Sequence, residues 1–266
     1  MTDKYAVLGN PIAHSKSPQI HAAFAEQTKQ GISYEAILAP LDGFEATVRD
    51  LIAKGYKGAN VTVPYKFEAY NLSNQHTERA RVAGAANTLI FSENGVLADN
   101  TDGAGLIADI VHNLHFSLAN KKVFLMGAGG AAAGVILPLL EAGALLSIAN
   151  RTPEKAKILA KLSPNIVGDV YSAFGSDEFD VVINATSSSL LDELPPLLSR
   201  NFSKNCLAYD MMYGRETPFV KFAKAQGAQV ADGLGMLVEQ AAEAFFIWRG
   251  VRPETAPVIA MLRKAI

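Results

Sequence analysis

The segment VFLMGAGGAAAGVILPLL occupies residues 123–140 and contains no charged residue. An uncharged apolar run of this length is typical of a membrane span. Four glycines and Pro138 interrupt it, however, and divide it into a short apolar run, a glycine turn and an alanine-rich run. That order is typical of a buried β-strand, a tight turn and a helix. We therefore predict a strand at 123–126 followed by a helix, and no membrane helix.

The turn in this segment consists of Gly127, Ala128, Gly129, Gly130 and Ala131. In a dinucleotide-binding fold, such glycines allow a tight turn and a close approach of the backbone to a pyrophosphate. The free N–H groups and the dipole of the following helix stabilise that anion. A single glycine motif is weak evidence, because packed α/β cores also use glycine-rich turns. The motif alone therefore leaves a structural turn as the alternative.

A second motif, Asn150-Arg151-Thr152, follows the glycine turn by about twenty residues, at the end of the next expected strand. Proteins that bind NAD usually place Asp or Glu at this point, where it accepts hydrogen bonds from the ribose hydroxyls. A cation with two neutral polar groups suits a 2′-phosphate instead, since arginine makes paired, charge-assisted bonds to it. A solvated loop charge is the alternative for Arg151. Together the two motifs favour NADP over NAD.

On both sides of this segment, apolar runs alternate with helical patterns, which predicts parallel strands joined by helical crossovers. Glu93-Asn94-Gly95 separates two further runs and predicts a hairpin. After Asp232-Gly233 the pattern is purely helical. We expect strands at 5–8, 34–38, 58–63, 88–91, 96–98, 123–126, 145–149, 181–184, 207–209 and 229–231. We expect helices from Ser17 onward and at 44–54, 102–114, 237–248 and 255–266.

The pattern predicts an α/β protein with two domains. Residues 1–101 form the first α/β domain, and residues 102–235 form a Rossmann-like, dinucleotide-binding domain. The final helices, within 236–266, have no strand of their own to cover. We expect them to pack back on the first domain and complete it.

The composition limits the classes of partner. The chain has 266 residues, with 24 Lys+Arg, 26 Asp+Glu and a net charge of -2. This balance argues against a nucleic-acid partner or a polybasic membrane anchor. The single cysteine, Cys206, excludes an internal disulfide, and the charged N-terminal residues do not resemble a signal peptide, so we expect a cytoplasmic protein. His112 and His115 lack a third clustered ligand, and we predict no metal site.

A polar loop follows the first expected strand and contains His14, Ser15 and Ser17. Ser17 precedes Pro18, so we predict that it is a helix N-cap. Ser15 has no such structural role, which makes it a candidate ligand-binding residue. His14 is either a general base or a solvated loop residue.

Further polar residues lie at strand ends, where an open α/β sheet places its ligands. Asn60 and Thr62 alternate with apolar residues, so both face the same side of a strand. Lys66 follows the break at Pro64 and is either a surface charge or a proton donor and acceptor. Asn87 is a similar strand-end group. Asp102 also suits a helix N-terminus, so capping is its structural alternative.

Several segments in one order resemble the shikimate dehydrogenase family over nearly the whole chain. These segments are GNPIAHSKSP (9–18), GANVTVPYK (58–66), GAANTL (84–89), DNTDG (99–103), GAGGAAAG (127–134), NRT (150–152), INATSS (183–188), YDMMY (209–213) and DGLGMLVEQAA (232–242). The resemblance implies an NADP-dependent, reversible reduction of 3-dehydroshikimate to shikimate in the pathway to aromatic amino acids. It also implies that the first domain binds the substrate.

The resemblance further implies a role for individual residues. Lys66, paired with Asp102, would carry the proton, and Ser15 and Ser17 would hold the substrate carboxylate. The ring hydroxyls would be held by Asn60, Thr62, Asn87, Asp102, Tyr213 and Gln240. NADP would be held by Gly127, Ala128, Gly129, Gly130, Ala131, Asn150, Arg151, Thr152, Lys155 and Thr186, with Glu78, Met211 and Gly233 as lesser contacts.

Two other functions remain open at this point. The first is an enzyme of the same family that also uses quinate or NAD. The second is a catalytically silent sensor of shikimate or quinate with a retained dinucleotide fold, against which the intact Lys66 and Asp102 argue. A monomer and a homodimer both fit the sequence.

Overall fold

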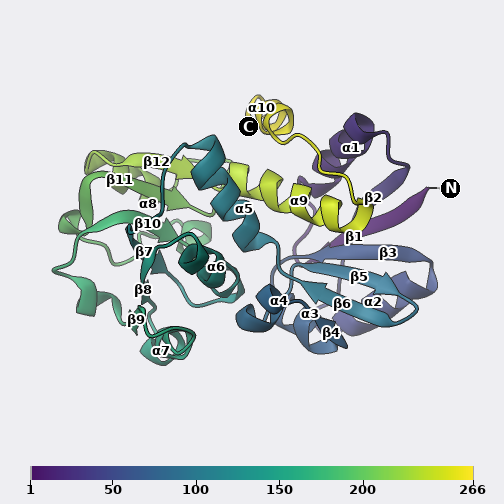
Figure 1. Ribbon diagram of the computed structural model, residues 1–266, viewed down its shortest axis with the longest axis horizontal. Coiled ribbons are helices and arrows are strands. Elements are labelled where there is room, and N and C mark those ends of the chain that lie inside the picture. The colour runs from purple at the N-terminus through teal and green to yellow at the C-terminus, as the bar shows by residue number, and fades with distance from the viewer. Residues whose placement is uncertain (1, 266) are drawn as a thin grey trace.

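The computed structural model describes residues 2–265, and only the backbone of residues 189 and 190. It contains two six-stranded sheets, which lie at opposite ends of the molecule (Figure 1). The predicted α/β architecture is therefore confirmed.

The first sheet has the strand order β2-β1-β3-β5-β6-β4. Its strands are β1 (Asp3–Gly9), β2 (Ile32–Leu38), β3 (Tyr56–Val61), β4 (Gln75–His76), β5 (Thr88–Ser92) and β6 (Gly95–Asp99). Strand β1 is parallel to β2 and β3, whereas β5 is antiparallel to β3 and forms the predicted hairpin with β6. The helices of this region are α1 (Ser17–Thr28), α2 (Phe44–Ala53), α3 (Lys66–Leu72) and α4 (Glu78–Ala83).

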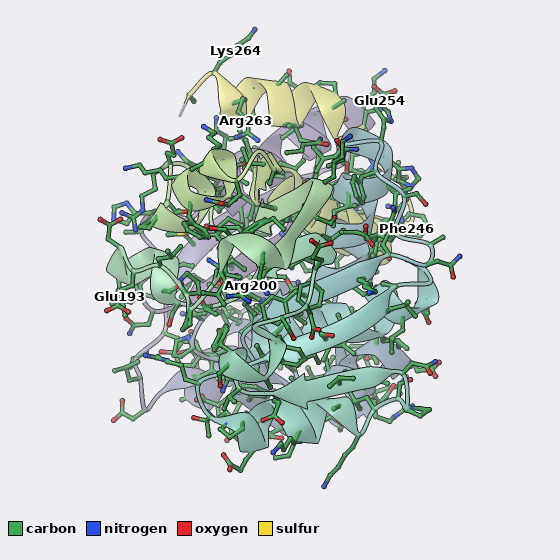
Figure 2. The ribbon with its side chains drawn as sticks, turned by 90° about the vertical axis from the view of Figure 1, so that its left-hand side faces the viewer. Glu193, Arg200, Phe246, Glu254, Arg263 and Lys264 are labelled. Carbon is green, nitrogen blue, oxygen red and sulfur yellow. The ribbon has the colours of Figure 1, made fainter. Side chains whose placement is uncertain are left out.

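The second sheet is entirely parallel, with the order β12-β11-β10-β7-β8-β9. Its strands are β7 (Lys122–Met126), β8 (Leu145–Ala149), β9 (Ile166–Asp169), β10 (Phe179–Asn184), β11 (Phe202–Asp210) and β12 (Gln229–Asp232). Its helices are α6 (Gly130–Glu141), α7 (Pro153–Ala160) and α8 (Pro218–Ala225). Figure 2 looks onto this end of the molecule, where the labelled side chains of Glu193 and Arg200 lie.

The uncharged segment 123–140 forms strand β7, the glycine turn and helix α6, as predicted. Residues Val123 and Met126 are fully buried in the sheet. Burial on both faces explains why the strand is a continuous apolar run. Among the described residues, no helix is long and apolar enough to cross a membrane.

Two helices lie between the sheets (Figure 1). Helix α5 (Asp102–Ala108) continues as a π-helical turn (Asp109–Asn113), and it packs against α9 (Leu234–Arg249). A Cβ at Gly105 would lie 2.7 Å from the backbone nitrogen of Gln240, so only glycine allows this close approach. The expected helix at 102–114 is thus α-helical only as far as Ala108.

The C-terminal helices α9 and α10 (Ala256–Arg263) contact the first sheet's side of the molecule. Phe245 of α9 packs with Phe24 of α1, and Trp248 stacks on Tyr5 of β1 with ring centroids 4.5 Å apart. This is the packing expected of helices that have no strand of their own. The domain boundaries at 101/102 and 235/236 remain predictions.

The structure differs from the sequence predictions at the starts of two helices and at two short strands. Lys16, not Ser17, is the N-cap of α1, and Ser17 is the first helical residue. Asp102 lies at the N-terminus of α5, as predicted, but as the first helical residue after the N-cap Thr101, so the capping alternative does not hold. Strands β4 and β9 were not predicted, because they are only two and four residues long and show no clear apolar run.

Candidate active site

A cavity of about 350 Å³ opens beside the carboxyl ends of β1 and β3. It is bordered by the first turns of α1, α3, α5 and α9. The nine residues that the sequence predicts for the substrate all line it, namely Ser15, Ser17, Asn60, Thr62, Lys66, Asn87, Asp102, Tyr213 and Gln240. The fold therefore collects residues from separate segments of the chain around one space. Their individual roles remain predictions.

Lys66 and Asp102 form an ion pair on this cavity. The distance between Lys66 Nζ and Asp102 Oδ2 is 2.5 Å, and the two side chains are 15% and 7% exposed. Lys66 begins α3, directly after the fully buried Tyr65, whose hydroxyl donates to the carbonyl of Ala39. Because Tyr65 also stacks on Phe44, it fixes the start of α3 and with it the position of the ammonium group.

The other oxygen of Asp102 is held by Asn87. Asn87 Nδ2 donates to Asp102 Oδ1 at 2.8 Å and to Thr101 Oγ1 at 2.9 Å, and it lies 3.2 Å from Gln240 Oε1. Asn87 Oδ1 accepts from the backbone N–H of Thr101 at 2.8 Å. The Asn87 amide is thus saturated by protein groups, and in this structure it orients the Asp102 carboxylate.

The local sequence predicts a structural role for Ser17 and none for Ser15, and the structure shows the reverse. The hydroxyl oxygen of Ser15 accepts a hydrogen bond from the backbone N–H of Ser17, so Ser15 has the structural role that the sequence did not indicate. Ser17 makes no side-chain cap and lines the cavity, although it is 7% exposed. No group among the described residues accepts the proton of the Ser15 hydroxyl, so Ser15 can still donate to a ligand.

Asn60 and Thr62 both line the cavity, and so do Val61 and Val63. The alternation of faces therefore stays a prediction. Tyr213 also lines the cavity and comes from the loop after β11. Burial raises the pKa of the Tyr213 phenol, which keeps it a neutral donor. His14 also lines the cavity and is exposed, so its two alternatives both survive.

The glycine turn lies where the sequence places it, between β7 and α6. Gly127 has φ +108°, and its N–H donates to the carbonyl of Ala149 at the end of β8. A Cβ at Gly129 would meet open space, whereas one at Gly130 would lie 3.4 Å from Lys66 Cβ. The turn is therefore open to solvent at Gly129 and lies next to the start of α3 at Gly130.

The remaining residues predicted for the cofactor lie mostly along one edge of the second sheet. Its parallel strands β8, β7, β10, β11 and β12 end side by side. The residues that follow them there are Asn150, Arg151, Thr152, Gly127, Thr186, Met211 and Gly233. Of the predicted cofactor residues, only Ala131, Met211 and Gly233 also line the cavity.

Glu78 is the exception among these predictions. It begins α4 and borders a second hollow, with Leu137, Pro138 and Glu141 of α6. None of these residues lines the cavity around Lys66. The structure does not bring Glu78 together with the glycine turn.

The residues at this edge fit a dinucleotide phosphate. Arg151 and Lys155 are exposed, and their side chains make no ion pair or hydrogen bond with the residues whose side chains the structure describes. Asn150 Nδ2 donates to the carbonyl of Thr152, which orders the backbone on both sides of Arg151. The open space at Gly129 and the first N–H groups of α6 supply an anion cradle beside the two cations. The donor set thus suits NADP.

Three residues whose side chains bond directly to those of predicted cavity residues were missed: Thr88 and Tyr34, which bond to Asn60, and Thr101, which bonds to Asn87. The Tyr34 hydroxyl donates to Asn60 Oδ1 at 2.7 Å, although Tyr34 lies outside the cavity lining. Its apolar strand context gave no signal, because a tyrosine in an edge strand is commonly structural. The only signal in the sequence is the hydroxyl of a tyrosine on a strand that runs parallel to the strand of Asn60.

Comparison with known proteins identifies the family. Three family models match this chain: the shikimate dehydrogenase substrate binding domain at residues 7–89, shikimate / quinate 5-dehydrogenase at 109–193, and the shikimate 5'-dehydrogenase C-terminal domain at 233–263. A protein of Methylobacillus flagellatus named "Shikimate dehydrogenase (NADP(+))" is 60% identical, with 99% of this chain and 100% of that protein covered.

Solved structures agree with this assignment. The crystal structure of an Ael1 enzyme from Pseudomonas putida has a TM-score of 0.93 at 47% identity, covering 98% of both chains. The shikimate 5-dehydrogenase of Thermus thermophilus, in complex with NADP(H) and shikimate, has a TM-score of 0.89 at 32% identity, covering 100% of both chains. On its sequence, its fold and the residues around its cavity, this chain belongs to the shikimate dehydrogenase family.

Proposed function

We propose that this protein catalyses the NADP-dependent, reversible reduction of 3-dehydroshikimate to shikimate. The observation that carries the proposal is the position of the Lys66–Asp102 pair. It lies where the polar cavity meets the glycine turn, with Lys66 Cβ 3.4 Å from the Cβ position of Gly130. A proton donor is thereby placed between a site for a polyhydroxylated acid and a site for a dinucleotide.

The residues around the pair divide the remaining tasks. The Ser15 and Ser17 hydroxyls donate to the substrate carboxylate, and Tyr213, Thr62 and Gln240 hold the ring. The glycine turn and Arg151 hold NADP, which supplies the hydride when bound. In the direction of reduction, the Lys66 ammonium donates a proton to the developing alkoxide at C3, and in the reverse direction the neutral amine accepts it. Asp102 holds the amine in place in both directions.

A panel of two substrates and two cofactors tests the proposal. Shikimate and quinate are each offered with NADP and with NAD, and the nicotinamide absorbance is followed. We expect the highest kcat/KM for shikimate with NADP. Comparable rates with quinate or NAD would indicate a broader dehydrogenase of this family, and binding of shikimate without any turnover would indicate a sensor.

The remaining expectations concern the protein's surroundings. The buried, unpaired Cys206 suits a reducing cytoplasm, which we propose as the compartment. A monomer and a homodimer remain the candidate states, and light scattering at enzymatic concentration distinguishes them.

A further inference from the structure

Tyr34 lies behind the wall of the cavity and reaches it through Asn60. It belongs to β2, the edge strand of the first sheet, while Asn60 belongs to β3, two positions further along in the order β2-β1-β3. The Tyr34 hydroxyl donates to Asn60 Oδ1 at 2.7 Å. Asn60 itself lines the cavity and is 6% exposed.

The side-chain amide of Asn60 has only one group left for a ligand. Its Nδ2 donates to the carbonyl of Asn87 at 3.2 Å and to Thr88 Oγ1 at 3.1 Å, which uses both N–H groups. Its Oδ1 accepts from Tyr34 and retains a second lone pair. In this orientation Asn60 can accept one more hydrogen bond and can donate none.

Tyr34 is held in place by His21 of α1. The imidazole lies flat on the Tyr34 ring, with centroids 4.1 Å apart and an angle of 10° between the planes. His21 is fully buried, and neither ring nitrogen has a hydrogen-bond partner within the described residues. Burial lowers the pKa of His21 to about 3, an effect that the nearby Asn60 amide opposes, so the ring is neutral near pH 7.

Burial also keeps the Tyr34 hydroxyl in its neutral, protonated form. Burial raises its pKa well above the ordinary value, and the neighbouring Ser17 hydroxyl opposes that effect. A neutral phenol beside Asn60 Oδ1 donates its only proton there. Tyr34 therefore lies between the residue proposed for a ring hydroxyl and one proposed for the carboxylate.

We propose that Tyr34 is a positioning residue that fixes Asn60 as a hydrogen-bond acceptor and thereby selects a substrate with a hydroxyl at that point of the ring. The acceptor suits a hydroxyl that the reaction leaves unoxidised, and it offers nothing to a ketone oxygen, which needs a donor such as Lys66. This inference rests on the proposed function, because it concerns how the same cavity orients shikimate.

The first test is Tyr34→Phe, which keeps the ring against His21 and removes the hydroxyl. We expect the KM for shikimate to rise about 10-fold, since a buried acceptor loses its fixed partner. We expect kcat within about 2-fold and an unchanged KM for NADP, because Lys66 and the glycine turn are untouched. The matched control is Tyr56→Phe, which removes a hydroxyl bonded to Glu35 on the surface of the same sheet.

The decisive measurement uses analogues of shikimate that lack the 4-hydroxyl or the 5-hydroxyl. If Tyr34 acts through Asn60, Tyr34→Phe weakens shikimate and one analogue but leaves the other, which lacks the selected hydroxyl, unaffected. In an Asn60→Ala background the effect of Tyr34→Phe also disappears. An equal loss for all three ligands, or a loss that persists in Asn60→Ala, would overturn the proposal.

This design separates the inference from the proposed function. Each result is the ratio of the variant's affinity to that of the wild type. If the wild type turns over shikimate, the affinity is read from KM. If it does not, the affinity is the Kd measured by calorimetry. A wild type without turnover contradicts the proposed function alone. The comparison remains decisive even if Tyr34→Phe lowers the Tm. A general loosening of the cavity would reduce the affinity for all three ligands equally, whereas the proposal predicts a selective loss.

Discussion

Lys66 and Arg151 are both proposed to act on ligands, but their surroundings differ. Lys66 is 15% exposed and lies within a chain of hydrogen bonds that runs through Asp102 and Asn87 to Thr101. Arg151 is exposed on the loop after β8, and its guanidinium makes no hydrogen bond or ion pair with any side chain that the structure describes. One cation is fixed by the fold, whereas the other is free to follow its ligand.

This difference predicts how each region responds to change. In the buried network every hydrogen bond sets the direction of the next, so the geometry for the proposed proton transfer exists before the substrate arrives. At the exposed edge the cations interact through water and salt, and each contributes a modest, screened attraction. Substitutions should therefore affect turnover in the first region and cofactor affinity in the second.

The largest expected effect is that of Lys66→Ala. Removal of the proton donor should lower kcat about 10²- to 10⁴-fold, the usual range for an acid–base group, while the KM for shikimate stays within a few-fold of wild type. Steady-state kinetics with shikimate and NADP measures both values. Lys57→Ala, on the exposed side of β3, is the matched control and should leave kcat unchanged. Near-wild-type turnover of Lys66→Ala would remove this residue from the mechanism.

The next effect concerns stability in the wall of the buried region. The pKa of His21 is about 3 in the folded protein against an ordinary value of 6.5. Between these values the unfolded chain binds the proton that the folded chain excludes, so the free energy of unfolding falls as the pH drops below about 6.5. The slope approaches about 1.4 kcal/mol per pH unit in the middle of that window, and it vanishes above it.

His21→Phe tests this linkage, because it keeps a flat ring against Tyr34 and removes the titrating group. Urea unfolding of wild type and variant between about pH 7 and about pH 5 gives the two stability curves. We expect the variant to lose about 2 kcal/mol less than wild type over this interval. Parallel curves would show that His21 does not titrate with unfolding. Subtraction cancels the carboxylates, which are common to both proteins.

The two regions also differ in what the sequence predicts of them. Strand β7 and the glycine turn are predictable because burial on both faces demands an unbroken apolar run, and a tight turn demands Gly127 with its positive φ. The polar residues of both regions are predictable as strand-end groups, and the family resemblance gives them roles. These signals are local, so one sequence is sufficient for them.

The local sequence does not determine which partner each polar side chain bonds. The preference of serine for N-caps favours Ser17 as a cap, yet the backbone places Lys16 there and turns Ser17 into the cavity. Asn87 has the pattern of a ligand-binding amide, whereas the packing of α5 and α9 brings Thr101 and Gln240 to saturate it. Such outcomes depend on which elements meet in space, and no pattern along the chain records that.

At the exposed edge, Arg151→Ala should raise the KM for NADP about 10-fold, the loss expected from one charge-assisted contact to a phosphate. The KM for shikimate and kcat should change little. Lys161→Ala, an exposed cation at the end of α7, serves as the matched control. Unchanged affinity for NADP in Arg151→Ala would mean that other groups bind the 2′-phosphate. A parallel loss with NAD would mean that Arg151 does not discriminate between the cofactors.

The smallest expected effect is that of ionic strength, and it compares the regions within one protein. An increase in NaCl from about 50 mM to about 500 mM shortens the Debye length about 3-fold, which screens exposed charges but not buried hydrogen bonds. The KM for NADP should therefore rise about 3-fold through Arg151 and Lys155. The KM for shikimate should hardly move, because Ser15 and Ser17, the residues proposed to bind its carboxylate, are neutral hydroxyls on the cavity. The NADP effect should shrink in Arg151→Ala, and an equal salt dependence for both ligands would contradict the contrast between a fixed and a free cation.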